Sequence, residues 1–393
     1  MNGATADGGE SLTVHQWLGR LAPDYQKRFG SALPQRHREV LKKILRCRTP
    51  ALGGQLFECP ECRAFHYRYH SCNDRHCPQC GQTDADHWLA RQRGRLLLPT
   101  PYFLVTFTVP EALRRFIRSH PQIALDLLFA GSAQALRDLA RNPRRLGADL
   151  GFLGVLHTWS RTLTFHPHIH YLVPGGGLSP DGRRWIAARP GFLLPVKPLG
   201  AHLCTLFNTR LQREHPDLFA QVPAQVWKRH WNVDSRPAGS GHNALRYLAR
   251  YVFKTATSNR TVPLTAQGKL RWSYRESQTG RQTSILLHPL EFMARFLQHV
   301  LPRGFARVRT FGWLHPAAKV RGNRVRALLG QAPWLTPAEE PTWNPPPDPD
   351  PDPPAKQTLP PSSAPVCARC QHVMRLAGCW RVGQPLLPPK RPP

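Results

Sequence analysis

The chain has 393 residues, long enough for two domains, and it carries 54 Lys and Arg against 24 Asp and Glu, a net charge of +30. An excess this large, spread along the whole chain, favours a polyanionic partner such as DNA or RNA. A membrane surface is the competing polyanion. The sequence argues against it, because it has no apolar run long enough to span a bilayer, no long basic amphipathic helix and no lipidation signal.

The start of the chain has neither a basic segment nor an apolar one, so no secretory signal is visible. Ten cysteines in such a chain indicate metal ligands or free thiols and argue against disulfides. We expect a cytosolic protein. Residues 1–35 are expected to form a partly disordered leader that ends in a short helical entry. From residue 35 to residue 47 apolar side chains recur at helical spacing among Lys and Arg, which predicts a basic amphipathic helix.

Two Cys-x-x-Cys motifs follow, Cys59/Cys62 and Cys77/Cys80, with fourteen residues between them. This spacing predicts a small ribbon in which the four thiolates share one tetrahedral Zn²⁺. Four thiolates leave no open coordination position, so this zinc would hold the fold and do no chemistry.

Cys72 and Cys47 are left over from this zinc site. Either one could replace a ligand of the site, join a second site with nearby histidines, or remain a buried free thiol. Basic and aromatic neighbours, Arg75 among them, favour a nucleic-acid contact for the ribbon, with a protein contact as the alternative. We place the zinc-binding ribbon and its basic helices at residues 36–95.

Residues 96–332 are expected to form the second domain, in which strands and helices alternate. The predicted strands are 102–109, 152–159, 162–173, 185–194, 264–273, 282–287 and 308–314, and the predicted helices are 111–118, 121–141, 202–212, 244–254, 289–301 and 321–330. Only two residues separate strands 152–159 and 162–173, so these two are expected to form a hairpin.

Strand 162–173 alternates polar and apolar residues, with His166, His168 and His170 on its polar face. Histidines at i and i+2 of a strand present imidazoles that a divalent cation can use, although a solvent face that happens to carry histidines is the alternative. His157 on the neighbouring strand could reach the same face. Pro167 suggests a bulge or an edge position, which would decide where His166 points.

Helix 244–254 places Tyr247 and Tyr251 one turn apart and opposite its apolar side. Tyrosines at this spacing usually pack in a core or lie on an amphipathic surface, but their position between the cations Arg250 and Lys254 weakens the core interpretation. Those two cations are the candidates for DNA contacts on this helix.

A tyrosine can attack a phosphodiester when a metal stabilises the charge that develops on the phosphate oxygens. The exchange leaves a 5′-phosphotyrosine and a free 3′-hydroxyl and needs no external energy. Consistent with this, the sequence contains no phosphate-binding loop of the Gly-x-x-x-x-Gly-Lys-Ser/Thr type.

At these residues the chain resembles the two-tyrosine HUH transposases of the insertion-sequence-91 type, over about residues 36 to 330. Its specific motifs are the Ser-Cys-x-x-Arg-His-Cys-Pro-x-Cys block at 71–80, the Phe-His-Pro-His-Ile-His run at 165–170 and Tyr-Leu-Ala-Arg-Tyr at 247–251. The resemblance implies an α+β fold, an HUH-type antiparallel sheet flanked by helices, with the tyrosine helix across the metal face and the small zinc ribbon before it.

By the same resemblance His168 and His170 are ligands of Mg²⁺ or Mn²⁺, and Tyr247 and Tyr251 are nucleophiles. The motif does not locate a third ligand, for which His166 and His157 are the candidates. The implied activity is that of a metal-dependent tyrosine transposase, which nicks and rejoins single-stranded DNA at transposon ends and target during rolling-circle transposition. The implied location is the bacterial cytosol, in association with the nucleoid.

Two other functions stay open. A catalytically inactive transposase would only bind DNA, through its zinc ribbon and its charge. Metal-dependent hydrolysis with water is disfavoured, because no acid falls near the histidines to act as a base and residues 101–330 contain only ten acids. The same scarcity argues against a transposase built on three acids. No feature of the sequence indicates an oligomeric state.

Residues 333–365 are proline-rich and predict a stiff, disordered linker. The tail, 366–393, carries one further motif, Cys367/Cys370, and Cys379. One motif and a single cysteine make an incomplete site, so no zinc is predicted there.

Overall fold

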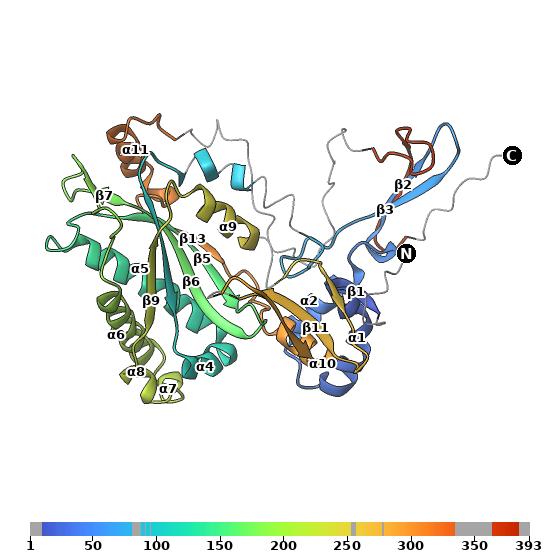
Figure 1. The fold of residues 1–393 in the computed structure, drawn as a ribbon, viewed down its shortest axis with the longest axis horizontal. Helices are drawn as coiled ribbons and strands as arrows, with labels where there is room; N and C mark the ends of the chain where they lie inside the picture. The colour runs from blue at the N-terminus through green and yellow to red at the C-terminus, as the bar shows by residue number, and fades with distance from the viewer. Residues whose placement is uncertain are drawn as a thin grey trace.

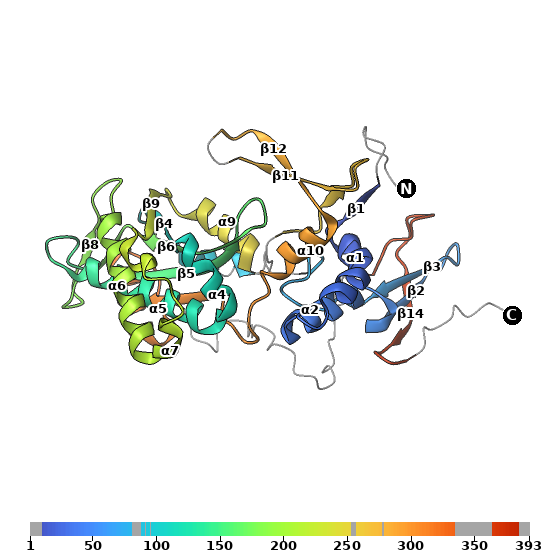
Figure 2. The same cartoon turned by 90° about the horizontal axis from the view of Figure 1, so that it is seen from below.

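The computed structural model describes residues 10–80, 88–90, 92–94, 96–252, 257–276, 279–334 and 364–384. Figure 1 shows the main sheet and its helices on one side of the molecule. On the other side lie α1 (Val14–Phe29), α2 (Gln35–Arg46) and α10 (Pro289–Leu297), and β2 (Gly54–Glu58) and β3 (Phe65–Tyr69) project from this second group. Figure 2 shows the same division from below.

The main sheet has five antiparallel strands in the order β13-β5-β6-β4-β9. Their bounds are β13 Val308–Gly312, β5 Gly151–Trp159, β6 Phe165–Pro174, β4 Tyr102–Thr108 and β9 Asn232–Pro237. The predicted hairpin is confirmed, because β5 and β6 pair directly. The edge strand β9 was not predicted, since its sequence Asn-Val-Asp-Ser-Arg-Pro is polar and largely exposed.

One face of this sheet packs against helices in the largest hydrophobic core. The helices of that core are α4 (Arg114–Ser119), α5 (Pro121–Arg141) and α6 (Val196–Glu214). Ile169 and Tyr171 of β6 are fully buried there, as the alternation of the strand predicts. The polar face of β6 therefore points the other way, toward α9 (His242–Val252).

Another hydrophobic core lies on the opposite face of the main sheet, under α9 and α11 (Lys319–Leu328). Leu245 and Leu248 of α9 are fully buried against Val155 and Leu172 of the sheet. Burial of these leucines fixes α9 on the sheet and leaves its opposite side outward. No helix in the described part of the chain combines the length and apolar character needed to cross a membrane.

The N-terminal part of the chain corrects the expected leader. Residues Val14–Phe29 form the helix α1, which Thr13 caps with a reciprocal hydrogen-bond pair to Gln16. Val14, Trp17 and Leu18 are buried at helical spacing, so the helix is longer than the short helical entry predicted from the sequence. The expected disordered residues 1–9 lie outside the described part of the chain.

Helix α1 shares its core with α2 (Gln35–Arg46), as predicted for that basic helix, and with α10 (Pro289–Leu297). The hairpin of β11 (Leu270–Arg275) and β12 (Gln282–Leu287) closes the same core. Residues assigned from sequence to the zinc ribbon and to the second domain thus contribute to one hydrophobic core.

A separate sheet of three strands has the order β14-β2-β3, with bounds β14 Arg375–Trp380, β2 Gly54–Glu58 and β3 Phe65–Tyr69. Its outer strand β14 comes from the tail, whereas most of the predicted proline-rich linker, residues 335–363, lies outside the described part of the chain. The remaining short elements are β1 Ser11–Thr13, β7 Gly176–Leu178, β8 Trp185–Ala187, β10 Thr261–Pro263, α7 Pro216–Phe219, α8 Gln225–Lys228, η1 Pro50–Leu52, η2 Glu111–Leu113 and η3 Pro316–Ala318.

Candidate active site and metal centres

Three histidines meet on the face of the main sheet that α9 covers. His157 lies on β5 and pairs in register with His168 on β6, and His170 follows two residues later on the same face. Their ligand nitrogens all lie within 4.8 Å of one another. The ring centroid of His157 is 5.3 Å from that of His168 and 4.6 Å from that of His170. Three imidazoles at this spacing can bind one cation.

His166, the other candidate for a third ligand, is not a member of this group. The register of β5 and β6 shifts between His157 and Trp159, where residues 165–168 of β6 lie opposite residues 157–159 of β5. This irregularity contains Pro167, which lacks an N–H to donate. Of the two alternatives that Pro167 suggested, the structure shows the bulge and not the edge position, because β6 lies between β5 and β4. Past the bulge, His166 interacts electrostatically with Arg114 and Glu111.

The surroundings keep the grouped histidines neutral, the form that binds a cation. Burial lowers the pKa of His168 to about 3, with the neighbouring His170 as a further cause, and burial lowers the pKa of His170 to about 4. Burial, followed by the charges of His170 and His168, holds the pKa of His157 well below its ordinary value.

Hydrogen bonds orient two of the three rings, those of His168 and His170. Nδ1 of His168 lies 2.6 Å from the carbonyl oxygen of His166. A carbonyl can only accept, so Nδ1 carries the proton and Nε2 of His168 keeps its lone pair for a cation. The hydroxyl of Thr106 on β4 lies 2.8 Å from Nδ1 of His170 and forms a hydrogen bond with that ring.

Tyr247 of α9 lies beside this group. Its ring centroid is 5.9 Å from that of His170 and 6.1 Å from that of His157, and 40% of the side chain is exposed. The phenol thus borders both the histidines of the sheet and the solvent. The side chains of Arg250 and Tyr251 and the whole of Lys254 lie outside the described part of the structure, so their predicted roles stay predictions.

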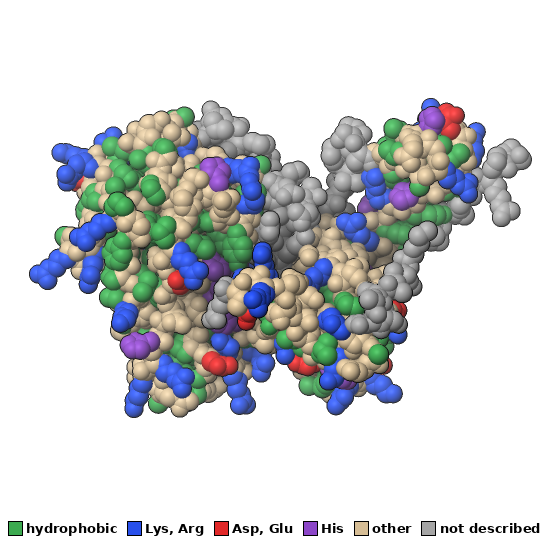
Figure 3. All heavy atoms as spheres, viewed as in Figure 1, with side chains coloured by type: hydrophobic (Ala, Val, Ile, Leu, Met, Phe, Trp, Pro, Cys, Tyr) green, Lys and Arg blue, Asp and Glu red, His purple; other side chains and the backbone are tan. Residues whose placement is uncertain are grey.

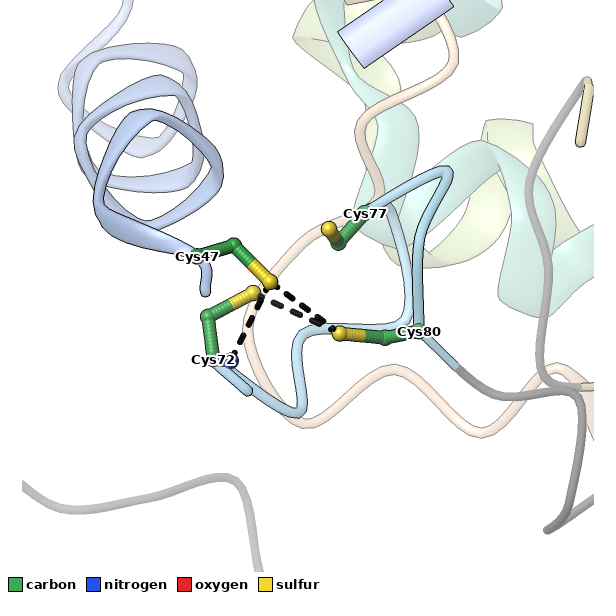
Figure 4. Close-up of side chains that lie close together, drawn as sticks. All are labelled: Cys47, Cys72, Cys77 and Cys80. Atoms are coloured by element: carbon green, nitrogen blue, oxygen red, sulfur yellow. Dashed lines mark hydrogen bonds between the residues drawn. The ribbon is translucent and has the colours of Figure 1, made fainter. Parts of the chain in front are cut away.

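The predicted zinc site of Cys59, Cys62, Cys77 and Cys80 is wrong, because the structure divides these cysteines between two clusters. The first cluster consists of Cys47, Cys72, Cys77 and Cys80, whose sulfurs all lie within 4.8 Å of one another. Figure 4 shows Cys47 reaching this cluster from the end of α2.

Distances within the first cluster fit zinc. A tetrahedral ion with Zn–S bonds of about 2.3 Å separates its sulfurs by about 3.8 Å. Sγ of Cys80 lies 3.5 Å from that of Cys47 and 3.8 Å from that of Cys72. Cys72, a candidate from sequence, is therefore a member of the cluster, and so is Cys47, which the sequence analysis left open.

The second cluster joins Cys59 and Cys62 to Cys367 and Cys370 of the tail. The prediction of an incomplete cysteine motif in the tail is therefore also wrong. Sequence spacing links neighbours along the chain, and the partners of this motif lie about three hundred residues away. Both clusters have the all-thiolate donor set of structural zinc.

Comparisons with known proteins agree with this layout. A family model described as a transposase zinc-binding domain matches residues 18–109, and another, described as "Putative transposase", matches residues 151–322. The "Putative transposase y4qJ" of Sinorhizobium fredii is 38% identical over 328 residues, which cover 77% of this chain and 80% of that protein. The chain belongs to the transposases of the insertion-sequence-91 type.

A second relative of the transposase is the transposase for insertion sequence element IS801 of Pseudomonas savastanoi pv. phaseolicola. It is 29% identical over 329 residues, which cover 77% of this chain and 76% of that protein. Among solved structures, a bacterial tRNA(His) guanylyltransferase-like protein in complex with ATP matches with 13% identity over 56% of this chain. Its TM-score of 0.19 is too low to bear on the fold.

The two family matches together contain the three histidines, Tyr247 and the first cysteine cluster of the transposase, whereas Cys367 and Cys370 lie outside both. The zinc-binding match and the cysteine clusters support structural Zn²⁺ in this protein.

Arg75, a predicted DNA contact, has a structural role in the transposase. Its guanidinium donates to the carbonyl oxygen of Phe305 at 2.6 Å and to that of Pro302 at 3.5 Å. These bonds tie the first cysteine cluster to the segment that leads into β13. Its contact with DNA stays a prediction.

Replacing Thr106 with valine tests the support of His170. The variant keeps the shape of the side chain and removes the hydroxyl beside Nδ1, so we expect the affinity for Mn²⁺ to fall by about 10-fold. Isothermal titration with Mn²⁺ measures this, with Thr108→Val on the same strand as the control. Equal affinities of Thr106→Val and the wild type would contradict the role of Thr106.

Proposed function

We propose that the transposase nicks and rejoins single-stranded DNA at transposon ends and target through a 5′-phosphotyrosine intermediate, in a rolling-circle route. Tyr247 is the nucleophile assigned here. The observation that carries this proposal is the position of its ring, with a centroid 5.9 Å from His170 and 6.1 Å from His157. We infer that the substrate is DNA because the chain belongs to a transposase family.

The donor set fits a divalent cation, since three neutral imidazoles converge within 4.8 Å. His157, His168 and His170 would hold it. A bound divalent cation supplies stabilisation of the charge that develops on the non-bridging phosphate oxygens. The family resemblance implies that this cation is Mg²⁺ or Mn²⁺.

Tyr247 carries out the bond exchange. Its phenol oxygen attacks the phosphorus, the bond from phosphorus to the 3′-oxygen breaks, and the proton lost by the phenol is balanced by one gained by the leaving 3′-hydroxyl. One phosphodiester replaces another, so the reverse attack by a 3′-hydroxyl rejoins the strand without an external energy source. The exposed side of the Tyr247 ring gives DNA access to the phenol.

Tyr251 is proposed as the nucleophile for a second strand. Its position follows that of Tyr247 by one helical turn on α9, a spacing at which two residues share one side of a helix. Two nucleophiles on one helix would allow one strand to be cut while another remains attached.

Strand-specific labelling tests the proposal. Single-stranded oligonucleotides from the ends of the insertion element are labelled at the 5′ or 3′ end and incubated with the transposase and Mn²⁺. We expect the 3′-labelled fragment to migrate with the denatured protein and the 5′-labelled fragment to be released. Release of both fragments would indicate hydrolysis by water, and binding without cleavage would indicate an inactive DNA-binding protein. Either result would overturn the proposal.

A further inference from the structure

The tail of the transposase returns to its N-terminal region at the second cysteine cluster. Sγ of Cys370 lies 3.4 Å from Sγ of Cys59 and 3.6 Å from Sγ of Cys62, and Sγ of Cys367 lies 3.5 Å from Sγ of Cys62. These separations are close to the value of about 3.8 Å that a tetrahedral zinc imposes on four thiolates.

Both motifs of this cluster form the same turn. The amide of Cys59 donates to the carbonyl of Ala64 at 2.9 Å, and the amide of Arg63 donates to the carbonyl of Cys59 at 3.0 Å. The residue after the second cysteine, Arg63, has a left-handed φ of 54°.

The tail repeats this turn residue by residue. The amide of Cys367 donates to the carbonyl of His372 at 2.8 Å, and the amide of Gln371 donates to the carbonyl of Cys367 at 2.9 Å. Gln371 follows the second cysteine of this motif and has a φ of 61°. A left-handed backbone is uncommon for residues other than glycine, so its recurrence at both positions points to a shared constraint, which a metal held by both turns would supply.

The tail also completes a sheet beside the cluster. Strand β14 pairs with β2 from Arg375 opposite Glu58 to Trp380 opposite Gly54. The indole of Trp380 is 2% exposed, and a Cβ on Gly54 would lie 2.8 Å from its Cη2 atom, so the absence of a side chain there admits the ring. The sheet is therefore shaped for the tail strand.

Two tyrosines of β3 contact the same indole. The rings of Tyr67 and Tyr69 stand edge-on to Trp380, with centroid distances of 5.8 Å and 5.9 Å.

Beside the cysteines, Phe57 and Met374 are buried in a core that contains a residue of each motif, Cys59 and Cys367. This core is small, and an isolated two-stranded hairpin is marginally stable in water, so β2 and β3 need both the tail strand and a metal.

We infer that Cys59, Cys62, Cys367 and Cys370 bind a second structural Zn²⁺, so that the C-terminal tail closes a zinc ribbon whose other half is N-terminal. The four thiols lose their protons as the ion binds, and no cysteine is oxidised. This site is independent of the proposed DNA chemistry and of the zinc in the first cluster.

Zinc content per chain tests this inference. Atomic emission is measured on protein purified in a reducing buffer, in a His157→Ala, His168→Ala background that removes zinc binding at the histidines. We expect two zinc ions in this background and one after Cys367→Ser plus Cys370→Ser. Cys47→Ser plus Cys72→Ser should also leave one, and the control Cys379→Ser, a substitution of an exposed cysteine on β14, should leave two.

Two zinc ions in the Cys367→Ser plus Cys370→Ser variant would overturn the inference. So would a single zinc in the parent protein, or disulfides joining the two motifs in the mass spectrum of the unreduced protein.

Truncation of the chain after residue 363 gives a second test, which does not depend on the folding of the cysteine variants. No residue of the described tail belongs to the three larger cores, so the rest of the protein should fold. We expect trypsin to cleave the truncated protein after Arg63 and Arg68 of the ribbon at least 10-fold faster than the full chain. Equal cleavage rates would count against closure by the tail.

Discussion

Tyr247→Phe is expected to lower formation of the covalent DNA adduct by about 10⁴-fold or to background, because the substitution removes the attacking oxygen and nothing else. The ring stays in place beside His170 and His157, and the side chain is partly exposed. The free energy of unfolding should therefore change by less than about 0.5 kcal/mol. Quantitative denaturing gels with a 3′-labelled single strand measure the loss of adduct.

Tyr274→Phe on the distant strand β11 is the matched control, and Tyr251→Phe on the same helix is the comparison that separates the two proposed nucleophiles. Tyr274→Phe should form the adduct at the rate of the wild type. If Tyr247→Phe kept the wild-type rate while Tyr251→Phe lost the adduct, the assignment of the first nucleophile to Tyr247 would be wrong.

The second large effect is expected at His157. His157→Ala removes one of the three ligand nitrogens, and we expect cleavage with Mn²⁺ to fall by about 10³-fold because stabilisation of the phosphate charge is lost. The affinity for Mn²⁺ should fall in parallel, and imidazole added to the solution should restore part of the activity. Single-turnover cleavage and calorimetric titration measure the two losses.

His166→Ala is the control for this prediction, because His166 lies on the same strand as two of the ligands but outside the group of three. It should keep cleavage within about 5-fold of the wild type, since its backbone carbonyl still accepts from Nδ1 of His168. If His166→Ala lost most of the cleavage activity while His157→Ala kept it, the third ligand would be His166 and not His157. Since His157 is 1% exposed, a thermal melt must show that its variant is folded.

Periodicity in the sequence predicted the face of the main sheet on which the site lies. The alternation in strand 162–173 separated Ile169 and Tyr171 from His168 and His170, and the structure buries the first pair in the main core. Helical spacing likewise separated Leu245 and its partners from Tyr247. These patterns depend only on residues close together in the sequence, so they can be recognised before the fold is known.

Pairing between distant segments could not be predicted in the same way. Three Cys-x-x-Cys motifs and two of the four single cysteines make two sets of four. Spacing alone instead paired the two motifs that are nearest in sequence. The structure joins Cys59 and Cys62 to the tail, and Cys77 and Cys80 to single cysteines at residues 47 and 72. The choice between His157 and His166 also needed the fold, because pairing of β5 with β6 brings His157 into the group with His168 and His170.

The central claim is that Tyr247 forms a covalent bond to DNA, and peptide mapping of the trapped adduct tests it most directly. The adduct formed with a single strand and Mn²⁺ is digested with nuclease and trypsin, and the peptide that retains nucleotide is sequenced by tandem mass spectrometry. We predict nucleotide attached through a 5′-phosphate to the phenol oxygen of Tyr247. Nucleotide found on a serine or a histidine, or no covalent peptide from a preparation that cleaves DNA, would contradict the account.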